Sequence, residues 1–185
     1  EDEIRLRAEQ LATLNVIGRR VTSSLSVNEV AQAGLDEIAR AASPDLAMFF
    51  IREDDKLILH SSRSPNDTLR HKETPLHRVG ECLCGLAVSE AQAIYSKNIH
   101  VDLRCTWKEC KEAGVVSFAA IPLRAGDSVL GVIGLASKVE RDFTETATFL
   151  ETLADQIAAG LQNARLYKAS QNRSSELAAL YKTSQ

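Results

Sequence analysis

Residues 117–137 read SFAAIPLRAGDSVLGVIGLAS, and this stretch decides the fold class. It contains two apolar runs, residues 117–123 and 128–137, which are separated by Arg-Ala-Gly-Asp at 124–127. Apolar runs of this length on either side of a short, glycine-containing turn are typical of a β-hairpin. The stretch therefore predicts two antiparallel strands that close a sheet.

Further strand patterns lie upstream of this hairpin. Residues 46–51 are apolar at successive positions, which predicts a central strand with both faces buried. A turn at 53–55 and the apolar residues 57–59 predict the returning strand of a second hairpin. Residues 77–114 are irregular, with a short strand expected at 93–95 and short helices at 84–88 and 107–113.

Helical patterns flank the strands. A helix is predicted over residues 26–42, and a long last helix is predicted to begin with Thr144 as its N-cap. We therefore divide the chain into an N-terminal helix (1–25), a globular part (26–165) and a helical extension (166–185).

The two ends of the chain carry heptad patterns. The segment LYKASQ at 166–171 returns as LYKTSQ at 180–185, an offset of 14 residues or two heptads. Apolar residues at heptad spacing also occur in the N-terminal segment, at Ile4, Leu11, Leu14, Val21 and Leu25. Because one small domain offers such a long helix few partners, pairing with a second copy would bury its apolar stripe. The pattern predicts a homodimer through the terminal helices.

Composition excludes several classes of protein. The net charge is −3 and charges of both signs are interspersed, which does not favour nucleic acid as a partner. No apolar run is long enough for a membrane span, and no secretory signal opens the chain. The chain begins Glu-Asp-Glu without Met, so we expect a piece of a longer, cytoplasmic protein whose thiols are reduced.

Four cysteines, Cys82, Cys84, Cys105 and Cys110, fall within 29 residues and indicate a local site. The first two would converge in a bent turn, and the last two would converge if Cys105 lies in a loop before a helix. Such a site has three interpretations: a metal centre (zinc or an iron–sulfur cluster), a metal-free thiol switch, or simple packing of small apolar residues. A bound cofactor and no cofactor are equally compatible with the spacing.

Specific residues resemble those of GAF domains. Residues 80–87, GECLCGLA, resemble the G-x-x-x-x-G-x-[AV] turn of that family. The pair of runs 117–123 and 129–135 resembles its closing hairpin, and Phe143-Thr144 before a long helix resembles its last element. The resemblance covers about residues 10–168.

This resemblance implies an α+β fold with an antiparallel sheet of five or six strands. Helices from the two termini would lie on one face, and the irregular middle would cover a small-molecule pocket on the other. The implied role is a non-catalytic sensory input domain (26–165) of a sensor histidine kinase or related regulator. An N-terminal signalling helix (1–25) and a coiled-coil extension (166–185) would join it to an effector domain in the same chain.

The resemblance leaves the ligand open. Trp107 and Phe118 are candidates for the pocket wall, since an aromatic ring can stack on a planar ligand. His100 is a candidate axial ligand if the group is haem. The alternative within the same fold is a free methionine-R-sulfoxide reductase, in which Cys84 and Cys110 would be the reactive cysteines. The acidic residue expected on the following strand is absent, because Phe118 occupies that position.

Overall fold

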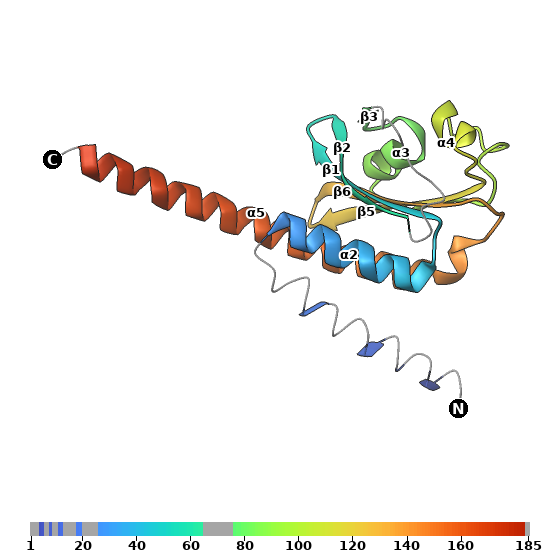
Figure 1. Cartoon of the computed structure of the whole chain (residues 1–185), viewed down its shortest axis with the longest axis horizontal. Helices are drawn as coiled ribbons and strands as arrows, with labels where there is room; N and C mark the ends of the chain where they lie inside the picture. The colour runs from blue at the N-terminus through green and yellow to red at the C-terminus, as the bar shows by residue number, and fades with distance from the viewer. Residues whose placement is uncertain are drawn as a thin grey trace.

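The computed structural model describes residues 26–64 and 76–183, together with isolated positions among the first 20 residues. The predicted N-terminal signalling helix therefore lies largely outside the described residues, and its assignment stays a prediction. Within the described ranges the chain forms an antiparallel sheet with helices on both faces (Figure 1). This confirms the predicted α+β class.

Six strands form one sheet in the order β3-β2-β1-β6-β5-β4, and each neighbouring pair is antiparallel. The strands are β1 (Leu46–Glu53), β2 (Lys56–Arg63), β3 (His77–Arg78), β4 (Ile94–Ser96), β5 (Ser117–Ala125) and β6 (Ser128–Ser137). The predicted closing hairpin forms β5 and β6, with Ser117 opposite Ser137 and Ile121 opposite Ile133. β1 is buried between β2 and β6, as its continuous apolar run predicts. The short β3 is the strand that the sequence pattern did not predict.

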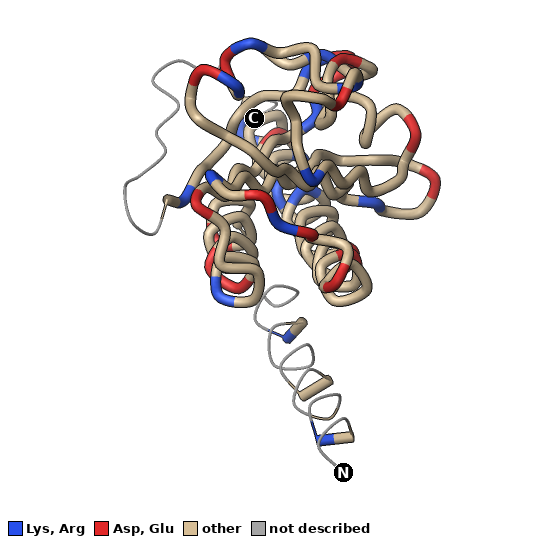
Figure 2. The backbone as a smooth tube through the Cα atoms, turned by 90° about the vertical axis from the view of Figure 1, so that its right-hand side faces the viewer, with Lys and Arg blue, Asp and Glu red and all other residues tan. Residues whose placement is uncertain are grey.

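Helices α2 (Val27–Ala42) and α5 (Ala147–Thr183) lie side by side on one face of the sheet (Figures 1 and 2). Their apolar sides and the facing strand residues form one core cluster, which includes Leu35, Ile38, Phe49 and Ile157. The predicted N-cap of the last helix is corrected. A short 3₁₀ helix, η1 (Phe143–Thr146), precedes α5, and Asp142 accepts a hydrogen bond from the Thr144 backbone N–H.

The irregular middle of the chain covers the opposite face. It contributes α3 (Cys82–Glu90) and α4 (Lys108–Glu112), joined through β4 and a loop over residues 97–107. A second core cluster lies between these elements and the sheet, and it contains all four cysteines. The two faces are therefore chemically distinct, since only one of them carries thiols.

α5 continues far beyond the domain. Its buried residues end at Ala164, and every residue from 166 to 183 is exposed. At 1.5 Å per residue this segment extends the helix by about 27 Å, and Figure 1 shows it projecting away from the sheet. We call residues 166–183 the α5 extension.

None of the described helices is long and apolar enough to cross a membrane.

Candidate thiol site

The turn at 80–85 positions the first pair of cysteines. Gly80 adopts a left-handed backbone with φ 87°, and its N–H donates to the Gly85 carbonyl over 2.8 Å. A side chain at Gly85 would lie 2.1 Å from the Arg78 carbonyl oxygen, so only glycine fits. The closed turn places Cys82 and Cys84 in the first turn of α3. Cys82 itself has φ 55°, a conformation that side-chain-bearing residues rarely adopt.

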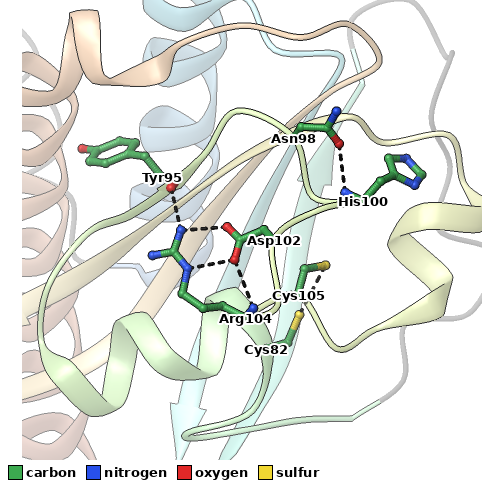
Figure 3. Close-up of polar contacts among 7 residues, drawn as sticks. All are labelled: Cys82, Tyr95, Asn98, His100, Asp102, Arg104 and Cys105. Carbon is green, nitrogen blue, oxygen red and sulfur yellow. Dashed lines mark hydrogen bonds and ion pairs between the residues drawn. The ribbon is translucent and has the colours of Figure 1, made fainter.

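A second turn positions Cys105. The Cys105 N–H donates to the Asp102 carbonyl over 3.1 Å, and the Arg104 guanidinium contacts both carboxylate oxygens of Asp102 at 2.7 and 2.9 Å. Arg104 also donates to the Tyr95 carbonyl over 3.0 Å, which ties this loop to β4 (Figure 3). We call this arrangement the Asp102–Arg104 latch. Arg104 holds the pKa of Asp102 well below its ordinary value, so the carboxylate stays ionised at neutral pH.

The four thiols converge on one small cavity. Cys105 lies in the loop before α4 and Cys110 within it, which is the arrangement that convergence requires. The cavity holds about 10 Å³, roughly the space for one water molecule. It is lined by His77, Cys82, Leu83, Cys84, Ile99, Cys105, Cys110 and Phe118.

Cys82 and Cys105 are in direct contact, with their sulfurs 3.9 Å apart (Figure 3). The hydrogen bond with Cys105, together with backbone hydrogen bonds at Leu83, Thr106 and Trp107, lowers the pKa of the Cys82 thiol to about 6, against the effect of burial. The same hydrogen bond and burial raise the pKa of Cys105. The pair therefore loses its first proton readily and holds its second tightly.

The other two thiols differ from Cys82. Burial raises the pKa of Cys84 well above its ordinary value, and the neighbouring thiols add to this effect. Burial likewise raises the pKa of Cys110 to about 12. At neutral pH these two side chains are protonated and act as small apolar groups.

His77 is a site residue that sequence reasoning missed. It is buried on β3, and its ring contacts those of Phe50 and Trp107, with centroid distances of 4.8 and 3.8 Å. A two-residue strand has no periodicity to detect, so the only available signal was a histidine close to the cysteine cluster in sequence.

The predicted pocket residues occupy different places. Phe118 on β5 lines the cavity. Trp107 packs against the same core and on His77, outside the cavity lining. His100 is exposed, and its Nε2 lies 3.1 Å from the Val115 carbonyl oxygen. The role of these three residues in binding a ligand stays a prediction.

The predicted metal site would need all four cysteines as ligands. Within residues 26–64 and 76–183, no three His, Cys, Asp or Glu side chains are arranged to hold a metal ion. The assignment of the four cysteines as metal ligands therefore stays a prediction.

With this geometry established, comparison with known proteins defines the class. The GAF domain family model matches residues 24–162, which is most of the chain. The chain belongs to the GAF domain family. It is also 26% identical, over 171 residues, to the sensor histidine kinase YhcY of Bacillus subtilis. That match covers 88% of this chain and 44% of the kinase, so the chain spans less than half of its relative.

Solved structures show the same fold. The GAF domain of a phosphoenolpyruvate-protein phosphotransferase from Acinetobacter superposes with a TM-score of 0.70 at 22% identity, covering 87% of this chain and 98% of that one. A free methionine-R-sulfoxide reductase from Neisseria meningitidis superposes with a TM-score of 0.71 at 16% identity, covering 86% and 92%. At these identities the likeness concerns the fold alone.

Proposed function

We propose that this GAF domain is a redox-sensing input module of a cytoplasmic signalling protein. The observation that carries the proposal is the convergence of four thiols on one cavity of about 10 Å³. A cavity of that size has no room for a nucleotide, bilin or haem, all of which need several hundred Å³. A change in the thiols themselves is therefore the stimulus that the site fits best.

A physical connection from this site to α5 supports a sensory role. Tyr95, whose carbonyl accepts from Arg104, donates its hydroxyl to Glu151 of α5 over 2.8 Å. Two residues further on, Lys97 pairs with Asp142 at 2.6 Å, directly before η1. The segment that carries Cys105 is thus connected to α5 at Glu151 and to the residue before η1 at Asp142, so its displacement would act on α5.

The α5 extension supports an output role for that helix. Its exposed large apolar side chains recur over two heptads at Leu166, Tyr167, Leu177, Leu180 and Tyr181. Pairing of two such helices in a homodimer would bury them. A signal that reaches Glu151 would then pass along a continuous helix towards an effector domain beyond it. In this role the domain is not itself an enzyme.

Hydrogen–deuterium exchange on the reduced and oxidised chain tests the proposal. Oxidation should change exchange in residues 97–107 and also at the start of α5, near Glu151. The α2 helix serves as the internal control, since neither fastening point lies on it. A change confined to the cysteine-bearing segments, with α5 unaltered, would count against a sensory role.

The same geometry leaves the methionine sulfoxide reductase alternative weaker. Cys84 and Cys110 line the cavity, but burial raises the pKa of both, which disfavours the thiolate that such chemistry needs. Turnover of free methionine sulfoxide with a thiol reductant would overturn the non-catalytic role.

A further inference from the structure

We propose that Cys82 and Cys105 are a specific dithiol switch that hydrogen peroxide closes to a disulfide, while Cys84 and Cys110 stay reduced. This inference rests on the proposed sensory function and names its reactive pair and its oxidant. The cysteines lie on separate elements, since Cys82 opens α3 and Cys105 belongs to the loop before α4.

The distance between the two sulfurs selects this pair. At 3.9 Å they are in van der Waals contact. The S–S bond of a disulfide is roughly 2.05 Å long, so the two sulfurs must move about 2 Å closer to each other. Cys82 is held by the closed glycine turn, whereas Cys105 is held by hydrogen bonds within an exposed loop. The approach therefore displaces the Cys105 loop more than α3.

The surroundings of Cys82 mark it as the attacking sulfur. Cys82 is the first residue of α3, and the positive end of a helix stabilises a thiolate. The backbone groups of Leu83, Trp107 and Thr106 favour its charged form further. Its thiolate attacks one oxygen of hydrogen peroxide, the O–O bond breaks, and hydroxide leaves and takes up a proton as water. The product is a sulfenic acid on Cys82.

Cys105 then resolves the sulfenic acid. Its sulfur attacks the Cys82 sulfur, the S–O bond breaks, and the departing hydroxide takes the Cys105 proton to form a second water. The balance is two thiols and one hydrogen peroxide giving one disulfide and two waters. The contact distance lets this step outrun further oxidation of Cys82 to a sulfinic acid.

Burial selects the oxidant. Cys82 is 5% exposed and Cys105 is 4% exposed, and the cavity beside them has space for about one water molecule. A molecule close to water in size, such as hydrogen peroxide, enters with little rearrangement. A bulky organic hydroperoxide requires the loop to open first.

Peptide mapping tests the pair directly. Trypsin separates the cysteines into peptides 79–97 (Cys82 and Cys84), 105–108 (Cys105) and 109–111 (Cys110). After stoichiometric hydrogen peroxide and alkylation of the remaining thiols, we expect peptide 79–97 linked to peptide 105–108, with a mass loss of two hydrogen atoms. A link to peptide 109–111, or no link while the thiols are consumed, would overturn the inference.

Matched variants assign the sulfurs within the shared peptide. Cys84→Ala and Cys110→Ala should keep the cross-link, and Cys82→Ala should abolish it. Cys105→Ala should stop at a sulfenic acid that dimedone traps on Cys82. The mapping of the unsubstituted chain stands even if one of these variants fails to fold. Retention of the cross-link in a folded Cys82→Ala variant contradicts the assignment.

Two further measurements test the choice of oxidant and the metal-free state of the thiols. Cumene hydroperoxide should form the disulfide at least tenfold more slowly than hydrogen peroxide, and equal rates would overturn the selection by size. Elemental analysis should find less than one metal atom per chain. Stoichiometric zinc or iron that protects the thiols until it is chelated would overturn the switch. If the disulfide is mapped but hydrogen–deuterium exchange in α5 does not change, the thiol switch is retained and only the proposed sensory function is contradicted.

Discussion

Gly80 and Gly85 show how single residues set the chemistry of the site. One provides a left-handed backbone, and the other allows two backbone segments to approach so closely that a methyl group would collide with the Arg78 carbonyl. These two requirements bend the chain so that Cys82 and Cys84 share a helical turn. The local backbone is therefore the reason that the first two thiols reach the cavity.

Substitution of Gly85 tests this local requirement. We expect Gly85→Ala to lower the free energy of unfolding by about 2 kcal/mol or more, because backbone must move to admit the methyl group. Gly126→Ala is the matched control: its φ is 59°, but its added methyl group meets nothing within 4 Å, so the cost should be about 1 kcal/mol. Urea denaturation measures both. Equal losses of unfolding free energy in the two variants would show that the turn does not require the close approach of Gly85 to the Arg78 carbonyl.

The Asp102–Arg104 latch gives a pH-dependent prediction. The folded pKa of Asp102 lies below its ordinary value of 3.8, so its stabilisation is present above that value and is lost as pH falls through the folded pKa. Asp102→Asn should therefore lower the free energy of unfolding by about 1 kcal/mol at neutral pH. This difference between wild type and variant should become smaller below about pH 4.

Urea denaturation of wild type and Asp102→Asn across pH 3–7 measures this gap. Asp127→Asn, on the turn between β5 and β6, should stay within about 0.5 kcal/mol of wild type throughout. A gap for Asp102→Asn that does not depend on pH would mean that the carboxylate charge is not what holds the loop.

At the scale of elements, the important feature is the connection between β4 and α5. β4 is an edge strand of three residues, yet Tyr95 on it contacts the thiol-bearing loop through its carbonyl and α5 through its hydroxyl. Its phenol is half-buried, and burial together with Glu151 raises its pKa, so the hydroxyl remains a donor at neutral pH. β4 thus joins the two faces of the sheet.

A double-mutant cycle measures this connection. Tyr95→Phe and Glu151→Ala should show a coupling energy of about 1.5–3 kcal/mol in the free energy of unfolding, the range for a hydrogen bond to a charged group. Tyr95→Phe and Asp155→Ala form the control cycle, because Asp155 lies one turn further along α5 and pairs with Arg124 instead. In this control cycle, the effects of the two substitutions on the free energy of unfolding should be additive. Coupling of equal size in both cycles would contradict a specific Tyr95–Glu151 bond.

At the scale of the whole molecule, the α5 extension is a helix whose residues are all exposed. An isolated helical segment of this length is marginal in water, which favours a second copy as its partner. Leu166 and Leu180, the first residues of the two repeated segments, are each 63% exposed. A dimer would give these leucines a buried environment.

Light scattering on the intact chain tests the homodimer. Leu166→Glu with Leu180→Glu should convert a dimer to a monomer while the melting temperature of the domain stays within a few degrees, since neither residue contacts its core. Lys168→Glu with Lys182→Glu, taken from the same repeat, is the control and should remain dimeric. A monomeric mass for the unsubstituted chain at tens of micromolar would remove the dimer.

Much of the fold could be predicted from the sequence because its signals are local. The apolar runs at 46–51 and 117–137 determine strands by period and length, and the turn residues beside them end each strand. The helices at 27–42 and 147–183 follow for the same reason. The clustering of four cysteines in one short segment is also a local signal, and it indicated a thiol site by spacing alone.

Only the tertiary structure decided how that site is built. Nothing in the spacing of the cysteines distinguishes the pair Cys82–Cys105 from the other possible pairs, because their contact depends on how the loop at 97–107 folds over α3. The hydrogen bond to Cys105 that lowers the pKa of Cys82, and the burial that raises the pKa of Cys84, are likewise properties of packing. His77 joins them only because a two-residue strand pairs with β2. Contacts between residues distant in sequence depend on how the whole chain folds, so local sequence periodicity does not predict them.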